Sequence, residues 1–194
     1  ATHSITNTPP VIDSISLSPA TPNVNTAALS CGAITSDVDG DSVILTYQWE
    51  VDGNPQNETS SSFSGPFLVA SQVTCIATPN DGKDSGSSAQ ASTIVDNTQP
   101  QVDSISLSPA TAYTNDTISV SASLSDDDSS QSVTATYAWH VIDAATGTDS
   151  EVQSGSSTTL DASYFVKNDQ VYVVVTPNDG VEDGNALSSS SLTI

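Results

Sequence analysis

The ten residues IDSISLSPAT (Ile12–Thr21) return almost unchanged as VDSISLSPAT (Val102–Thr111), ninety positions later. A second stretch, TPNDG, occurs at Thr78–Gly82 and again at Thr176–Gly180. Self-similarity at one long period is the signature of a repeated module, and each copy has the size of an ordinary domain. We therefore expect two tandem domains, at residues 1–95 and 96–194.

Short runs of alternating apolar and polar residues fill both copies. Val11–Ser18 alternates Ile and Leu with Ser and Asp, which predicts a half-buried edge strand. About seven such runs in each copy, separated by turn residues, predict an all-β chain of two β-sandwich domains. The expected strands are 11–18, 27–35, 43–51, a Ser-rich stretch ending at Phe63, 67–70, 72–79 and 88–95, then 102–108, 117–125, 132–142, 151–155, 157–162, 169–177 and 185–194.

The charge balance excludes two classes of function. Asp and Glu number 23 against 2 Lys and Arg, and the formal net charge is -21. Binding to nucleic acids or to anionic membranes needs clustered basic side chains, so we expect neither partner. No run of eighteen apolar residues occurs, so no insertion into a membrane is expected. Self-repulsion at this charge destabilises a compact domain unless cations screen or bind it, which suggests a divalent metal or a salty medium.

Cys31, Trp49 and Cys75 follow the order of the strand B cysteine, strand C tryptophan and strand F cysteine of an immunoglobulin-like domain. The chain resembles the broad group of Ig-like and cadherin-like repeats found in large bacterial and archaeal surface proteins of the adhesin type. The resemblance implies a Cys31–Cys75 disulfide across the core of the first domain. The alternative is a pair of buried free thiols in a reducing compartment.

The second copy differs from the first in two respects. Val173 replaces Cys75, and Val120 or Ser121 falls where Cys31 would be, so this domain must be stable without a disulfide. About eight extra residues, centred on AATGTDSE, lengthen the loop that follows Trp139, and insertions of this kind lie on surfaces.

Carboxylates gather in two loops of each copy, before the tryptophan strand and after strand F. These loops lie at one end of a sandwich, so the carboxylates should converge, and Ca²⁺ takes six to eight such oxygen ligands. An EF-hand is rejected because the glycine of DVDGD is misplaced and a strand follows it. The alternative to a metal site is a set of solvated acidic turns. The expected ligands in these loops are Asp37, Asp39, Asp41, Asp81 and Asp84, then Asp126, Asp128, Asp179 and Asp183.

The linker extends the calcium prediction to the junction. Strand A begins at the end that carries these loops, so Asp96 and Asn97 should enter beside the second acidic group. Asn7, ninety positions before Asn97, should do the same for the first. This arrangement resembles cadherin-like repeats, which implies calcium shared between neighbouring domains and a stiffened rod.

Catalysis finds no support in the sequence, and we expect no enzyme. The two histidines are His3, near the terminus, and His140, on a strand, and there is no GxSxG motif. The acidic loops are duplicated, which favours a structural role over paired glycosidase carboxylates. An isopeptide crosslink through Lys83 or Lys167 is rejected, because neither lies on an expected core strand. Two sequons, at Asn57 and Asn115, are possible N-glycosylation sites.

These observations together predict an extracellular structural repeat at a cell surface: a calcium-stiffened stalk, spacer or fibre segment. The alternatives are a calcium-dependent adhesion or carbohydrate-binding module, and a head-to-tail self-assembling filament subunit. The last residues, SLTI, match STIV (Ser92–Val95) at the end of the first copy, so a further copy would continue the pattern. The expected partners are neighbouring repeats of the same protein, or identical subunits arranged head to tail.

Overall fold

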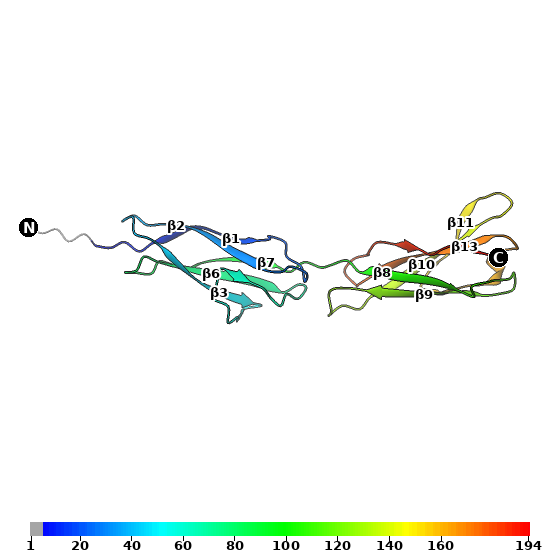
Figure 1. Cartoon of the computed structure of the whole chain (residues 1–194), viewed down its shortest axis with the longest axis horizontal. Coiled ribbons are helices and arrows are strands. Elements are labelled where there is room, and N and C mark those ends of the chain that lie inside the picture. The colour runs from blue at the N-terminus through cyan, green and yellow to red at the C-terminus, as the bar shows by residue number, and fades with distance from the viewer. Residues whose placement is uncertain (1–5) are drawn as a thin grey trace, which may run out of the picture. The chain divides into compact units, whose positions relative to one another are not determined.

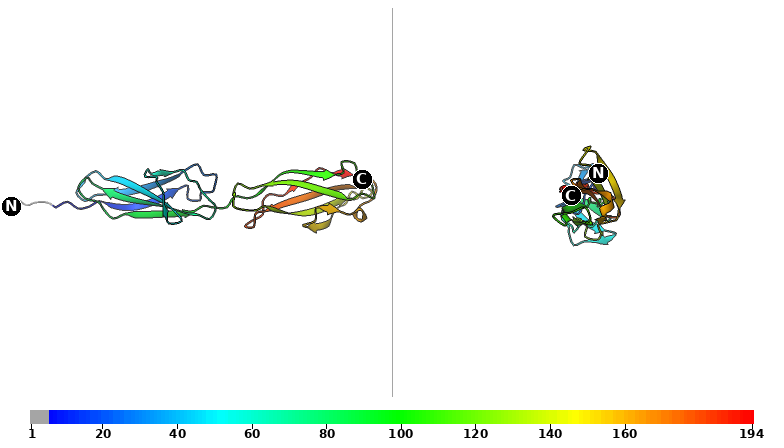
Figure 2. Two further views of the ribbon diagram at one scale, coloured as in Figure 1. Left: turned by 90° about the horizontal axis from the view of Figure 1, so that it is seen from below. Right: turned by 90° about the vertical axis from the view of Figure 1, so that its right-hand side faces the viewer.

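The computed structural model describes residues 6–194, so His3 lies outside the described residues. The chain divides into two compact units, Ala1–Asn97 and Thr98–Ile194, which we call the first unit and the second unit. The division falls two residues after the boundary expected from the sequence. Each unit is a sandwich of two antiparallel sheets, as Figures 1 and 2 show.

The first unit packs a three-stranded sheet against a four-stranded one. The smaller sheet has the order β1 (Val11–Ser18), β2 (Leu29–Ser36), β5 (Ser62–Phe63). The larger has the order β4 (Asn54–Pro55), β3 (Ile44–Val51), β6 (Gln72–Asn80), β7 (Ala89–Ile94). As the alternating pattern of its residues predicts, β1 is an edge strand.

The second unit repeats this order with one addition. Its smaller sheet is β12 (Thr159–Leu160), β9 (Ile118–Ser125), β8 (Gln101–Ser108), and its larger sheet is β11 (Asp149–Gly155), β10 (Thr134–Ile142), β13 (Gln170–Asn178), β14 (Leu187–Ser188). A last short strand, β15 (Leu192–Thr193), also pairs with β13, and one 3₁₀ turn, η1, covers Ala162–Tyr164. The predicted fold class, two tandem Ig-like β-sandwiches, is confirmed.

A tryptophan and a disulfide form the centre of the first core. Trp49 is fully buried and its Nε1 donates to the carbonyl of Ser60 over 2.9 Å. Its ring stacks on Phe63 with centroids 5.4 Å apart. Cys31 on β2 and Cys75 on β6 form the implied disulfide, which joins the two sheets. The strand B to strand F pairing of an Ig-like domain is therefore present.

Valines take the places of both cysteines in the second core. Leu17 pairs with Cys31 in the first unit and Leu107 pairs with Val120 in the second. Val120, and not Ser121, therefore corresponds to Cys31. Trp139 pairs with Val173 as Trp49 pairs with Cys75, so Val173 corresponds to Cys75. Trp139 is fully buried and donates to the carbonyl of Ser157 over 3.1 Å. This core has apolar side chains where the first has its disulfide.

Several sequence predictions differ from the structure, among them the strand expected at 157–162, of which only Thr159–Leu160 forms a strand. Residues 67–70 form no strand: Pro66 precedes them, Ala70 has a φ of 66°, and Phe67 is buried by an edge contact with Phe63 instead of by pairing in a sheet. The run 185–194 contains only the two short strands β14 and β15. The predicted surface insertion lengthens a hairpin, because its last three residues, 149–151, already belong to β11 and pair with β10.

Two glycines let the segment before each first strand approach the second sheet closely. A Cβ on Gly86 would overlap the carbonyl oxygen of Pro10, and one on Gly184 would overlap that of Pro100. Each glycine amide also donates to a proline carbonyl of its own hairpin over 2.9 Å. The close approach fixes the segments that contain Asn7 and Gln99 beside the loops that carry the carboxylates.

Candidate metal centre

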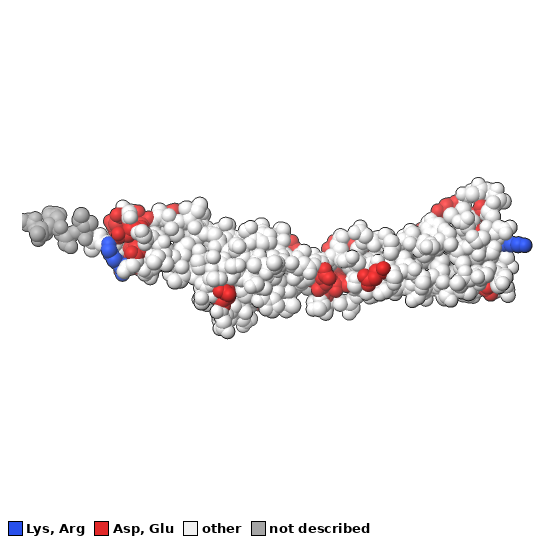
Figure 3. Space-filling view, in the orientation of Figure 1, with Lys and Arg blue, Asp and Glu red and all other residues white. Residues whose placement is uncertain are grey.

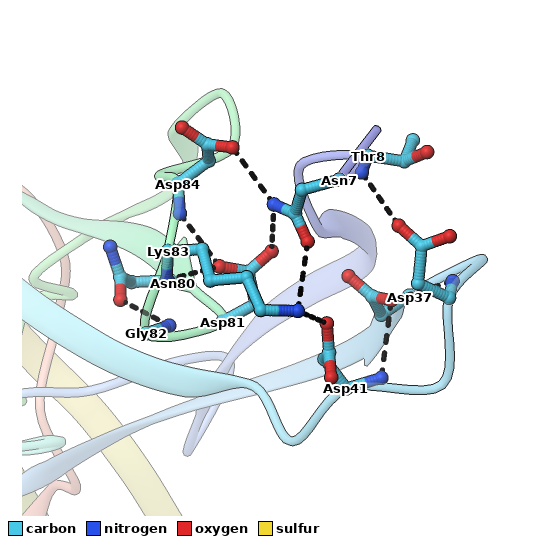
Figure 4. Close-up of polar contacts among 10 residues, drawn as sticks. Asn7, Thr8, Asp37, Asp41, Asn80, Asp81, Gly82, Lys83 and Asp84 are labelled. Carbon is cyan, nitrogen blue, oxygen red and sulfur yellow. Dashed lines mark hydrogen bonds and ion pairs between the residues drawn. The ribbon is translucent and has the colours of Figure 1, made fainter. Parts of the chain in front are cut away.

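The carboxylates of the first unit lie in two loops at the same end of its sandwich. Asp37, Asp39 and Asp41 follow β2, while Asp81 and Asp84 follow β6. We call these five residues the first acidic cluster. Figure 3 shows acidic side chains gathered at one end of the first unit beside a basic one, and Figure 4 shows their contacts.

The segment that precedes β1 joins the two loops. Asn7 Nδ2 donates to Asp81 Oδ2 over 2.9 Å and to Asp84 Oδ2 over 2.8 Å. The amide of Thr8 donates to Asp39 Oδ2 over 2.6 Å. Asn7 thus contacts one loop while Thr8 contacts the other (Figure 4).

Lys83 is the basic side chain of this cluster. Its Nζ lies 2.7 Å from Asp41 Oδ2 and 3.4 Å from Asn7 Oδ1. The hydrogen bond and the charge of Asp41, followed by the charges of Asp81 and Asp39, raise the pKa of Lys83. The ammonium group therefore interacts with carboxylates from both loops.

Each loop of the first unit is also organised by one aspartate that accepts backbone amides. Asp37 Oδ1 accepts from the amides of Asp39 and Asp41 over 2.8 and 3.2 Å. Asp81 Oδ1 accepts from Lys83 and Asp84, each over 2.7 Å. Hydrogen bonds from the amide of Asp84 and then from the side chain of Asn7 lower the pKa of Asp81 to about 2. Asp37 Oδ2 is buried and has no hydrogen-bond partner.

The second unit has a matching loop after β9. The amide and hydroxyl of Thr98 donate to Asp128 Oδ2 over 2.7 and 2.8 Å. The amide of Asp128 donates to Asp126 Oδ1 over 2.8 Å, and the hydroxyl of Thr98 lies 3.4 Å from that same oxygen. Both carboxylates thus meet at Thr98, as Asp39 meets Thr8 in the first unit.

Two carboxylate oxygens of this loop are buried without a hydrogen-bond partner. Asp128 is 1% exposed, and its Oδ1 accepts no hydrogen bond. Asp126 Oδ2 is also buried and has none. A buried carboxylate oxygen without a donor is costly, because it has lost water and gained nothing in exchange. These two oxygens are therefore free to accept a bond from a cation.

The loop after β13 supplies the remaining carboxylates of the second unit. Asp179 is 5% exposed, and its Oδ1 accepts from the amides of Val181 and Glu182 over 2.7 and 2.8 Å. Glu182 Oε2 accepts from Gln99 Nε2 over 3.0 Å. We call Asp126, Asp128, Asp179 and Glu182 the second acidic cluster.

The remaining predicted ligands are Asp183, Asp96 and Asn97. Asp183 accepts from Asn178 Nδ2 over 2.7 Å within its own hairpin, and its place corresponds to Ser85 of the first unit. Asp96 belongs to the first unit, where its amide donates to the carbonyl of Pro22 over 2.7 Å, and Asn97 is the last residue of that unit.

Sequence reasoning missed Glu182 and the role of Lys83. The register of the TPNDG repeat contains the signal for both. In the repeat, Glu182 occupies the position of Asp84 and Val181 that of Lys83. Aligning the turns residue by residue would have paired them.

The chemistry of the donor set suits Ca²⁺, which accepts carboxylate, hydroxyl, backbone and water oxygens in flexible geometry. Among residues 6–194, no three His, Cys, Asp or Glu side chains are already arranged as a metal site. A bound ion would therefore draw on two neighbouring carboxylates, Asp126 and Asp128, together with backbone or hydroxyl oxygens and water.

The inserted hairpin of the second unit carries a separate polar group. Asp149 on β11 accepts from the Tyr172 hydroxyl over 2.6 Å and lies 3.1 Å from Nδ1 of His140. The imidazole stacks on the Tyr172 ring with centroids 4.7 Å apart. The hydrogen bond to Asp149, followed by burial, raises the pKa of Tyr172 to about 12. His140 thus packs against a neighbouring strand.

The two sequons lie outside the regular strands. Asn115 is exposed in the connection from β8 to β9, and Asn57 is exposed between β4 and β5. Within the described residues, no helix is long and apolar enough to span a membrane.

No family model and no curated protein matches the chain. Among solved structures, a two-domain fibronectin type III segment of chicken tenascin covers 94% of this chain and 99% of its own, with 15% identity and a TM-score of 0.43. Three N-terminal domains of the outer capsid protein Hoc of bacteriophage RB49 cover 95% of this chain and 69% of their own, with 16% identity and a TM-score of 0.39. Domains A168–A170 of titin cover 95% of this chain and 66% of their own, with 10% identity and a TM-score of 0.34.

Proposed function

We propose that this chain is an extracellular structural segment, a spacer or stalk built from tandem β-sandwiches and stiffened by cations at their acidic ends. The observation that carries the proposal is the repeated attachment of the leading segment to the acidic loop. Thr8 donates to Asp39 and Thr98 donates to Asp128 through the same backbone amide. A repeated structural contact suits a role in which length is gained by adding equivalent units.

The shortness of the connection supports a stiff spacer. Asp96 is hydrogen-bonded to Pro22 in the first unit, and Thr98 is hydrogen-bonded to Asp128 in the second. Asn97 is the one residue between them. A flexible linker needs several residues free to rotate, so this connection has little chain to flex.

Thr98 connects the acidic loop of the second unit to the leading segment. A cation bound to Asp126 and Asp128 would neutralise the loop to which the amide and hydroxyl of Thr98 are bonded. Without it, repulsion between the two carboxylates favours opening of the loop and release of the leading segment. Calcium at about 10⁻⁴–10⁻³ M, the range in which extracellular modules bind it, would then set the stiffness.

Among residues 6–194, an adhesive or carbohydrate-binding role finds no exposed tryptophan at the acidic ends. Trp49 and Trp139 are both fully buried, and the exposed Tyr113 lies in the connection from β8 to β9. Self-assembly into a filament remains compatible with a spacer built from repeats. Electron microscopy of the native material distinguishes them, because a filament shows many separate chains.

The test is ¹⁵N relaxation of the whole chain, measured with calcium and then with EDTA at equal ionic strength. The proposal predicts that the two units share one rotational diffusion tensor with calcium and tumble as separate bodies in EDTA. Independent tumbling under both conditions would show that no cation stiffens the connection.

A further inference from the structure

We infer that the two acidic clusters are neutralised by different cations: the tethered ammonium of Lys83 in the first unit, and a bound divalent ion, calcium, in the second. The inference rests on the proposed role of cations at these clusters and states which cluster needs one from solution. It makes the second unit the calcium-responsive one.

Lys83 and Val181 occupy the same place in the fold. Each follows its aspartate by two residues and donates its amide to that carboxylate over 2.7 Å, Lys83 to Asp81 and Val181 to Asp179. The next residue of each loop donates to the same oxygen, over 2.7 Å from Asp84 and 2.8 Å from Glu182. The backbone is therefore equivalent, and the side chain is what differs.

In the first unit the lysine already supplies positive charge between the loops. Its Nζ reaches Asp41 at 2.7 Å and Asn7 at 3.4 Å, and Asp81 and Asp39 contribute to its electrostatic environment. Figure 4 shows the ammonium directed between the two loops. A second cation in this cluster would be repelled by it at short range.

In the second unit no basic side chain can supply positive charge between the acidic loops as Lys83 does in the first. Val181 is apolar and 67% exposed. The chain has two basic residues, and the other, Lys167, precedes β13 whereas Asp179 follows it, so the length of the strand separates them. Only a cation from solution can therefore neutralise the negative charge of this cluster.

Burial shows where that ion would bind. Asp128 is 1% exposed with Oδ1 unpartnered, and Asp126 Oδ2 is also buried and unpartnered. In the first unit Asp37 Oδ2 is likewise unpartnered, but Asp39, which takes the place of Asp128, is exposed. The other oxygen of each carboxylate lies near the Thr98 hydroxyl, which is 2.8 Å from Asp128 Oδ2 and 3.4 Å from Asp126 Oδ1. A hard dication that accepts oxygen ligands in irregular geometry matches this set, and this favours Ca²⁺ over Mg²⁺, which demands a near-ideal octahedron.

The experiment is a calcium titration of the ¹⁵N-labelled whole chain, read from amide chemical shifts at constant ionic strength. In the wild type, the amides of Thr98, Asp126 and Asp128 should shift and saturate, while those of Thr8 and Asp39 should not. Lys83→Val should make the first cluster titrate as well. Val181→Lys should raise the calcium midpoint of the second cluster by about tenfold or more, because a lysine charge placed within a few ångströms of the ion opposes it.

Two controls change the same charges elsewhere. Lys167→Val removes a lysine on the far side of β13 from the cluster, and Val166→Lys adds one at a neighbouring exposed position. Neither should alter the response of either cluster. Amide spectra without calcium report directly whether each variant is folded.

Two failures can be told apart. If both clusters of the wild type saturate at the same calcium concentration and Lys83→Val changes nothing, the division of roles is wrong although the proposed function stands. If neither cluster responds in any variant, the cation hypothesis itself is wrong.

Discussion

The two units place a buried tryptophan at the same point of the same sandwich, yet hold the fold around it differently. The first has the Cys31–Cys75 disulfide and a lysine between its acidic loops. The second has Val120 and Val173 in the core and Val181 at the loop. The comparison shows that topology and the attachment of the leading segment are common to both repeats, whereas crosslinking and charge neutralisation are local solutions.

The largest expected effect tests the common core. Trp139→Ala should destabilise the second unit by about 3–5 kcal/mol, because it removes a fully buried ring and the hydrogen bond to Ser157. Urea unfolding followed by circular dichroism measures the loss. The fluorescence of Trp49, then the one tryptophan left, should keep its wild-type midpoint. A shift of both midpoints would mean that the units do not unfold independently.

The next test removes the difference between the cores. The double replacement Cys31→Val and Cys75→Val should lower the stability of the first unit by about 2–4 kcal/mol, because the disulfide closes a loop with a sequence separation of 44. The reverse change, Val120→Cys with Val173→Cys, should form a disulfide in the second unit because the strand register is the same. Urea midpoints and free-thiol counts check both. Free thiols in the second variant would show that the cores are less alike than the register indicates.

A smaller effect tests the close approach shared by both units. Gly86→Ala and Gly184→Ala should each cost about 1–3 kcal/mol, since the added methyl would overlap the carbonyl oxygen of Pro10 or Pro100. Gly32→Ala is the matched control, because its Cβ would meet Ser16 Oγ at an ordinary 3.9 Å. Thermal melts give the comparison. Equal effects at Gly32 and Gly86 would contradict the steric argument.

The smallest effect concerns a contact that only the second unit has. Tyr172 donates to Asp149 of the inserted hairpin, and Thr74 occupies its place in the first unit. The pKa of the folded-state phenol is raised from 10.0 to about 12, so the stabilisation is fully present below pH 10 and is lost as the pH rises through about 12. Spectroscopic titration of the tyrosines should show a last step that Tyr172→Phe abolishes. A last step unchanged by the substitution would assign it to another tyrosine.

Much of this fold could be predicted from the sequence because its signals are local. The alternation in Val11–Ser18 and the Cys31, Trp49, Cys75 order each identify a strand or a core position directly. The strand predicted at 67–70 was wrong. Phe67 is apolar because it packs in the core, and Pro66 and the positive φ of Ala70 keep this segment from pairing as a strand. Short strands such as β4 and β5 carry too few residues for a periodic pattern.

The candidate site was less predictable than the fold. Acidic loops are visible in the sequence, but which carboxylates are buried depends on the chain that covers them. Asp128, which was predicted as a ligand, is buried, and its neighbour Asp127 is exposed, but the run of aspartates gives no sign of how deeply Asp128 is covered. The pairing of Lys83 with Asp41 likewise joins loops more than forty residues apart.

The most direct test of the account is calorimetric unfolding of the whole chain in about 10 mM calcium and in EDTA, at equal ionic strength. With a dissociation constant of about 1 mM, calcium should stabilise the second unit by about 1.4 kcal/mol and leave the first unchanged. Reduction of the disulfide identifies the transition of the first unit. A second-unit transition at the same temperature in calcium and in EDTA would contradict the claim that its acidic cluster is held by a cation.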